Sequence, residues 1–494
     1  MLNQYLNTTT IFKKETLWAL SFVLLSIIVS LIYLLSNGSV FTTVAIILLI
    51  LIITLTFYRL TWGFYLFICL VLLFDQFPPR GYGITIIGVE YFLNLKSLNL
   101  FKNIEFAVIN PLELHLILLI LAWIFVFITR KNLYFQKIPN WLALILLFFW
   151  LSLSLIIGLS RGGDFLPALW ELRALFYMGF MIIITPQIIQ SKKDLINLIW
   201  FIIVTLTIKA FIGIIRLIRL GFDFGGRTEL TNHEDPLFFI SLMILLLSFI
   251  LFKYKSSQKT FLYYIFPLIF IIFLFSQRRA AYAAFFMGII AFLFLIQKEH
   301  LKTLLKFLIP FLIIFTIYTT IFWNSTGTIA IPAQLVKASI TEPKNPSDLR
   351  FYSNLYRKVE NYNLAQTVVK SPIIGIGFGK KYDQPIPLVH IPFPLQEYIP
   401  HNEIFWIMVK SGAIGFFFFF LFFNSYIFQI SLLYKKIDDP YLKSICSMII
   451  IATIGQLVVS FYDLQLTYYR NMIFLGTLLG LLPTIKTITA LNNK

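Results

Sequence analysis

The chain has 494 residues, of which 59% are hydrophobic and only 13% are charged. Soluble domains carry roughly 25% charged residues, so this composition excludes an ordinary soluble globular protein. The formal net charge is +18, but the lysines and arginines are spread over short loops instead of being gathered on one polar face. This distribution excludes a nucleic-acid-binding surface and suits contact with anionic lipid or with an anionic substrate.

The apolar residues are clustered in runs near 20 residues long, the length that an α-helix needs to cross a bilayer. Backbone groups in lipid must be hydrogen-bonded within the chain, so each run is predicted to be a helix. We predict an all-α polytopic membrane protein with about 12–14 transmembrane helices and a large outer loop that contains an amphipathic helix. The candidate spans lie near residues 17–35, 40–58, 60–74, 111–129, 140–158, 168–189, 194–219, 236–252, 260–276, 279–297, 302–323, 402–433, 441–461 and 466–486.

These spans divide the chain into three regions. Residues 1–323 form a transmembrane bundle of about 11 spans, residues 324–401 form a large outer loop, and residues 402–494 form C-terminal transmembrane helices. Lysines fall mainly in the loops after even-numbered spans, as Lys253 and Lys255 do. By the positive-inside rule these loops and both termini are cytoplasmic, and the large loop therefore faces the other side.

The large loop carries two recognisable features. Leu349 to Lys370 has apolar or aromatic residues at helical spacing, which predicts an amphipathic helix lying across the outer surface. Gly375, Gly377 and Gly379 then follow in SPIIGIGFGK. These glycines resemble a nucleotide-binding loop, but no parallel strand precedes them, so we predict a tight turn. A proline-rich stretch leads from this turn to His401.

Arginines are found near the predicted outer ends of the spans. Interfacial anchoring is one interpretation, because a long stem can cover apolar surface while the charge reaches the headgroups. This interpretation stays open for Arg216 and Arg219. It fits Arg279 less well, because a buried guanidinium needs a partner and a phosphate is gripped bidentately. The outer arginines are Arg161, Arg173, Arg216, Arg219, Arg227, Arg278 and Arg279.

His401 opens the predicted span at PHNEIFWIMVKSGAIG. A helix N-terminus carries partial positive charge and favours a neutral imidazole ring, which can accept a proton as a general base. The alternative is a capping or interfacial histidine without a chemical role. Gly412 and Gly415 in the same span are predicted to allow another helix to approach closely. The other histidines show no metal-ligand spacing, so no metal site is predicted.

The motif around His401 resembles the O-antigen ligase and O-antigen polymerase superfamily of bacterial envelope proteins. His401-Asn402, nine residues and then Gly412-x-x-Gly415 match the ligase-type signature His-[Asn/Ser/Gln]-x9-Gly-x-x-Gly. Ahead of it, the segment from Arg350 to the glycine turn resembles the family's pattern of an arginine, an aromatic stretch and Ser-Pro-x-x-Gly-x-Gly.

Two further elements resemble the same family. Ser276 to Arg279 resembles a Ser-x-Ser-Arg element, with Arg278 in place of the second serine. Arg227 resembles an arginine of the preceding outer loop. The resemblance implies that His401 is catalytic and that Arg227 and Arg279 bind substrate, with Arg278, Arg350 and Asn402 beside them.

The resemblance also implies an activity: glycosyl transfer on the outer face of the bacterial inner membrane, facing the periplasm or cell exterior. The donor would be a glycan on undecaprenyl pyrophosphate. The acceptor would be a sugar hydroxyl on lipid A-core in a ligase, or on another lipid-linked glycan in a polymerase, and the motif favours a ligase. Family members are expected to need no metal or other cofactor.

A flippase for lipid-linked oligosaccharides, or another polysaccharide transporter, is the alternative. Transporters tend to show repeated halves and ionisable residues near the middle of the membrane. Here the middles of the predicted spans are nearly free of charge and one outer loop dominates, which favours the glycosyltransferase.

Overall fold

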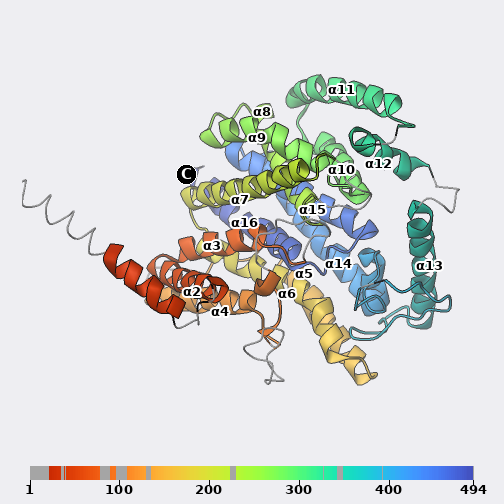
Figure 1. The fold of residues 1–494 in the computed structure, drawn as a ribbon, viewed down its shortest axis with the longest axis horizontal. Helices are drawn as coiled ribbons and strands as arrows, with labels where there is room; N and C mark the ends of the chain where they lie inside the picture. The colour runs from red at the N-terminus through yellow and green to blue at the C-terminus, as the bar shows by residue number, and fades with distance from the viewer. Residues whose placement is uncertain are drawn as a thin grey trace, which may run out of the picture. The chain divides into compact units, whose positions relative to one another are not determined.

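The computed structural model describes residues 22–34, 38, 40–77, 89–95, 108–129, 135–222, 230–325, 327–341, 349–391 and 393–492. Over these residues the regular structure is helical, without a strand (Figure 1). The helices are Phe22–Leu34, α2 (Val40–Tyr58), α3 (Leu60–Leu73), η1 (Val89–Tyr91), α4 (Pro111–Thr129), α5 (Trp141–Ser160), α6 (Phe165–Ile188), α7 (Lys192–Arg219), α8 (Asp235–Leu251), α9 (Ser257–Leu274), α10 (Arg279–Leu295), α11 (Lys298–Ile321), η4 (Thr328–Ala330), α12 (Ile331–Ile340), α13 (Leu349–Lys370), α14 (Glu403–Lys436), α15 (Pro440–Tyr462) and α16 (Tyr469–Asn492).

The prediction of an all-α polytopic membrane protein is confirmed. Each predicted span contains a helix, and nine helices among the described residues are long and apolar enough to cross a membrane. Other apolar helices are shorter, such as α8 and α10 with 17 residues each. A helix of that length reaches about 25 Å, close to the thickness of the hydrocarbon core.

The chain forms two compact units. The first consists of Met1–Phe67 and Leu114–Arg130, and the second of Ile68–Glu113 and Lys131–Lys494. Every residue of the candidate site described below lies in the second unit.

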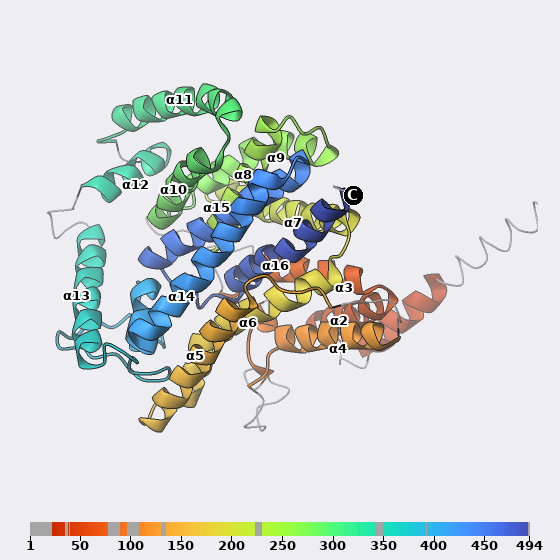
Figure 2. The same cartoon turned by 180° about the vertical axis from the view of Figure 1, so that it is seen from behind.

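Small residues bring the central helices of the second unit together. Gly476 and Gly480 of α16 face α6, and a Cβ at these positions would lie 2.5 Å from Met178 O and 2.8 Å from Thr185 Cβ. Such close approach is typical of membrane helices, which gain stability from packing and not from water exclusion. The helix α15 packs against α8, α10 and α14, and α5 packs against α14 (Figures 1 and 2).

The predicted amphipathic helix is present as α13, with the predicted bounds. Leu364 on its inner face is buried with Tyr382 and Val409, while Tyr352 and Leu355 on its outer face are exposed. The helix packs against α14. The predicted outer loop also contains α12, which the sequence analysis did not anticipate.

The three glycines after α13 form the predicted tight turn. Gly375, Gly377 and Gly379 have φ angles of 74°, 89° and 80°, in the region that only glycine adopts readily. The turn lies against backbone atoms of α14: the Ile376 N–H donates to Val409 O and the Gly377 N–H donates to Lys410 O, both at 2.9 Å.

This pairing is possible because α14 is interrupted at Gly412, where φ is 67° and ψ is −174°. Beyond the interruption the Ala413 N–H donates to Pro372 O at 2.8 Å. The prediction that Gly412 admits a second helix is therefore wrong, because the position admits the backbone of the segment from Pro372 to Gly375. Gly415 does meet another helix: its Cβ would lie 2.6 Å from the Trp150 side chain of α5.

A buried ion pair fastens the same turn to α6. Glu171 and Lys410 are fully buried and lie 2.7 Å apart, and Glu171 also accepts from the Gly379 N–H at 2.5 Å. Lys410 donates to Lys380 O. Removing either partner would leave a buried charge unpaired, so the pair fixes this turn in one position.

Candidate active site

The candidate site is built from helix ends that face α13. His401 precedes α14, Arg278 and Arg279 open α10, His233 precedes α8, and Asp463 follows α15. Helix ends leave backbone groups and polar side chains exposed to one another, so charged groups can be gathered here without interrupting the apolar spans.

His401 is held by Glu360 of α13. The Glu360 carboxylate accepts from the His401 backbone N–H at 2.9 Å and lies 3.2 Å from ring Nδ1 through both oxygens. Glu360 is 2% exposed and the histidine side chain 23% exposed. Tyr356, one turn earlier on α13, packs edge-on against the imidazole. The ring is therefore fixed on one side and open on the other.

Asp463 is the second carboxylate of the site, and it lies among cationic groups. Burial by itself would raise the pKa of the Asp463 carboxyl, but the nearby Arg278 guanidinium opposes it. His233, Arg357 and His401 act in the same direction, and together they hold this pKa below its ordinary value. Residues far apart in the sequence thus share one electrostatic environment.

A small pocket opens beside this group. Arg278 bonds to His233 Nε2 and lies 3.7 Å from the Asp463 carboxylate. A separation of 3.7 Å is longer than a direct hydrogen bond, so the Arg278 guanidinium can also bind a second anion. The pocket is lined by His233, Pro236, Leu237, Arg278, Ala280, Ala281, Val459, Asp463 and Gln465.

The two adjacent arginines diverge. Arg279 donates to Ala338 O and to Asn354 Oδ1, both at 3.1 Å, and so joins α10 to α12 and α13. Arg278 turns instead toward α8 and α15. The sequence analysis ranked Arg279 above Arg278, whereas the structure brings Arg278 into the pocket.

Arg357 lies one turn beyond Asn354 on the same face of α13, and sequence reasoning did not single it out. It is half-buried, and its guanidinium makes no hydrogen bond or ion pair within the described part of the chain. It nevertheless acts on Asp463. A cation so placed is available to an anionic ligand.

The other predicted site residues are distributed differently. The Asn402 side chain accepts from the Phe405 N–H at 3.0 Å and caps α14, so its substrate contact stays a prediction. Arg350 belongs to α13, but its side chain lies outside the described residues, as does Arg227 altogether. Arg216 is 1% exposed, which contradicts anchoring at the lipid interface.

Glu403 connects His401 to the segment after α15. Its buried carboxylate accepts from the Thr467 hydroxyl at 2.6 Å and from the Thr467 N–H at 3.1 Å, and also from the N–H groups of Gln465 and Leu466. The start of α14 and the loop that carries Asp463 are thereby held together.

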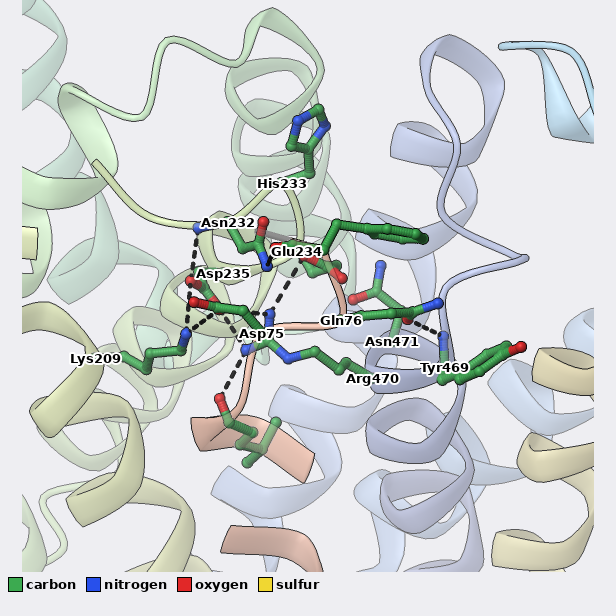
Figure 3. Close-up of polar contacts among 12 residues, drawn as sticks. Asp75, Gln76, Lys209, Asn232, His233, Glu234, Asp235, Tyr469, Arg470 and Asn471 are labelled. Carbon is green, nitrogen blue, oxygen red and sulfur yellow. Dashed lines mark hydrogen bonds and ion pairs between the residues drawn. The ribbon is translucent and has the colours of Figure 1, made fainter. Parts of the chain in front are cut away.

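A buried ionic network lies next to His233, which lines the pocket (Figure 3). Arg470 of α16 lies 2.6 Å from Asp235 and 3.3 Å from Glu234, and donates to Leu72 O at 2.7 Å. Lys209 of α7 pairs with Asp75 and lies 3.7 Å from Asp235. All of these charges are buried.

The network fixes the segment that carries His233. Asn232, Glu234 and Asp235 all take part in it, and the His233 ring points away from it toward Arg278 (Figure 3). Lys209 lies within α7, and the other charged members lie at helix ends. No local pattern in the sequence predicts such a network, because its members come from α7, α16, the end of α3 with the residues after it, and the start of α8 with the residues before it.

The arrangement combines two chemical capacities. A histidine with one ring nitrogen held by a carboxylate can accept a proton at the other. Guanidinium groups gathered beside it can bind phosphate oxygens and stabilise developing negative charge. Among the described residues no group of three or more His, Cys, Asp and Glu side chains is arranged to hold a metal ion.

Comparison with known proteins agrees with this chemistry. Residues 264–420 match the family described as O-antigen ligase, a range that runs from α9 into α14. It includes Arg278, Arg279, Glu360 and His401. A comparison with curated proteins finds no match. The chain is therefore a multi-pass membrane protein in which residues 264–420 carry an O-antigen ligase domain.

Proposed function

We propose that the chain transfers a glycan from an undecaprenyl-pyrophosphate donor to a sugar hydroxyl on the outer face of the bacterial inner membrane. The observation that carries this proposal is the juxtaposition of His401, fixed by Glu360, with the cations around Asp463. A base and an anion site are the two requirements of this reaction, and the family match supports the same class.

In the proposed mechanism the acceptor hydroxyl oxygen attacks the anomeric carbon of the donor. The bond from that carbon to the pyrophosphate oxygen breaks, and its electron pair leaves with undecaprenyl pyrophosphate. His401 Nε2 takes the hydroxyl proton and later releases it to solvent. Arg278, Arg279 and Arg357, together with Arg227, stabilise the charge that builds on the leaving group.

The acceptor distinguishes two forms of the activity. A ligase uses a hydroxyl of lipid A-core, and a polymerase uses a hydroxyl of another lipid-linked glycan. The family description and the His401 signature favour the ligase. The envelope glycan of a deletion strain separates them: a ligase defect leaves the acceptor without polymer, and a polymerase defect leaves it with a single repeat unit.

Donor binding by the arginines is tested on purified protein with lipid-linked donor and acceptor. Arg278→Ala and Arg279→Ala should each lower transfer by roughly 10²–10³-fold, the usual effect of removing one donor to a developing oxyanion. Lysine at position 279 should rescue poorly, because it keeps the charge but loses the planar fork.

The matched control is Arg219→Ala, at the exposed end of α7. Its transfer rate should stay near the wild-type value. Equal small losses in all three alanine variants, with unchanged melting temperatures, would remove the arginines from the donor site.

The buried ionic network favours a second candidate function, transport of a lipid-linked oligosaccharide, because ionisable groups inside a bundle often mark a transport path. Its charges are paired with one another, as expected of a support for the pocket. A transporter would translocate lipid-linked donor in vesicles without forming the glycosidic product, whereas the proposed enzyme forms it.

A further inference from the structure

We infer that Glu360 is the positioning residue for His401: it holds Nδ1 and directs Nε2 to the acceptor hydroxyl. The inference rests on the proposed function and adds a residue that neither the sequence signature nor the family match assigns. Glu360 acts through the imidazole ring, so it is not itself a catalytic group.

The carboxylate holds the histidine at two points. It accepts from the His401 backbone N–H at 2.9 Å and faces Nδ1 at 3.2 Å with both oxygens. Two contacts to one residue fix the position of the backbone and the rotation of the ring. Glu360 is itself immobilised, because its side chain is 2% exposed on a helix packed against α14.

The contact also selects the tautomer. An ionised carboxylate only accepts hydrogen bonds, so the proton of a neutral ring must reside on Nδ1. Nε2 then presents a lone pair, and it makes no hydrogen bond with the described residues. The carboxylate also stabilises the imidazolium that forms when Nε2 takes the acceptor proton, as the carboxylate does in a Ser-His-Asp triad.

Other charged and titratable groups face the same ring. Tyr356 comes from α13, and Asp463 comes from the end of α15, where Arg357 also acts on it. Glu360 is distinguished from Asp463 because it bonds directly to the ring.

The test compares Glu360→Gln with wild type in a transfer assay over a range of pH. The kcat value should fall by roughly 10- to 10³-fold with the donor KM little changed, since the arginines are untouched. The acid limb of the pH profile should move about one unit lower, because loss of a neighbouring negative charge lowers the pKa of a histidine.

Glu397→Gln is the matched control. This carboxylate lies in the same outer segment but is half-exposed and pairs with Lys381, so its substitution should leave both kcat and the acid limb unchanged. In a His401→Ala background, Glu360→Gln should cause no further loss, because a positioning residue acts only through its partner.

A wild-type kcat in Glu360→Gln would overturn the inference. A lower kcat would also overturn it if the acid limb of the pH profile did not move and the loss of kcat added to the loss caused by His401→Ala. If Glu360→Gln fails to fold, Glu360→Asp is the second test, because it keeps the negative charge but moves it away from the His401 ring. The kcat of Glu360→Asp should fall about fivefold or more, and a wild-type kcat overturns the inference. Near wild-type turnover in His401→Ala would instead overturn the proposed base itself.

Discussion

Asp463 lies where the charges of the site meet. Its carboxyl is buried, which by itself disfavours the ionised form, yet Arg278 and its cationic neighbours hold the pKa below the ordinary value. A carboxylate whose pKa is lower in the folded state than in the unfolded state stabilises the protein at pH values above the unfolded-state pKa. This stabilisation is lost as the pH falls through the folded-state pKa.

Asp463→Asn should therefore reduce the melting temperature in detergent most at neutral pH. The difference from wild type should shrink below about pH 4, the ordinary pKa of an aspartate, as the wild-type carboxyl becomes protonated. Asp383→Asn is the control, because that exposed carboxylate pairs with exposed Lys370. A difference that stays constant from pH 7 to pH 3 would mean that Asp463 is not held ionised by its neighbours.

Site residues that stand out from the sequence around them were predictable, and site residues that do not were not. His401 opens a span after a proline-rich stretch, and Arg278 and Arg279 interrupt an apolar run, so each is visible in its own segment. Glu360 precedes His401 by 41 residues and is one polar residue of an amphipathic helix among several. Its role depends on the packing of α13 against α14, which no spacing in the sequence records.

At the scale of the elements, α14 and the glycine turn form one unit. The interruption at Gly412 opens backbone groups of α14 to the segment from Pro372 to Gly377. A Cβ at Gly412 would lie 2.2 Å from Ile373 O, closer than any carbon and oxygen atoms can pack. The part of α14 before Gly412, which begins just after His401, is thereby oriented by the segment from Pro372 to Gly377.

Gly412→Ala should consequently destabilise the protein far more than the conformational cost of an alanine at positive φ, which is roughly 1–2 kcal/mol. Gly162→Ala isolates that cost, because Gly162 also has positive φ (78°) but no atom lies within 4 Å of its Cβ position. Melting temperatures of the two variants provide the comparison. Equal effects would show that the turn does not depend on the interruption of α14.

The elements themselves were largely predictable. Hydrophobic spacing gave the bounds of α13, and positive φ at three closely spaced glycines agrees with the predicted turn. The interruption of α14 was not predictable, because Gly-x-x-Gly in an apolar run is equally compatible with an intact helix that packs closely on another. Only the backbone partners at Pro372 and Ile376 distinguish the two cases.

At the scale of the whole molecule, the proposed reaction requires a definite orientation. The lysine distribution predicts a cytoplasmic loop at residues 253–259 and an outer position for 324–401. Apolar run length predicted where the helices lie, because it reports directly on bilayer thickness. It could not predict the ionic network around Arg470, whose partners come from separate spans.

Cysteine labelling in whole cells tests this orientation in a Cys69→Ala, Cys446→Ala background. Val389→Cys, at a side chain 77% exposed in the predicted outer loop, should react with a membrane-impermeant reagent in intact cells. Lys255→Cys, in the predicted cytoplasmic loop, should react only after permeabilisation. The reverse pattern would place His401 on the cytoplasmic side and would exclude the proposed acceptor.

The most direct test of the proposed mechanism is the turnover of purified, folded His401→Ala protein, measured together with its affinity for the lipid-linked donor. Loss of a positioned general base should lower turnover by roughly 10²–10⁴-fold. Donor affinity should change much less, because Arg278, Arg279 and Arg357 remain. Turnover near the wild-type value would contradict the account, since Glu360 and the cation cluster would then surround a histidine that takes no part in the reaction.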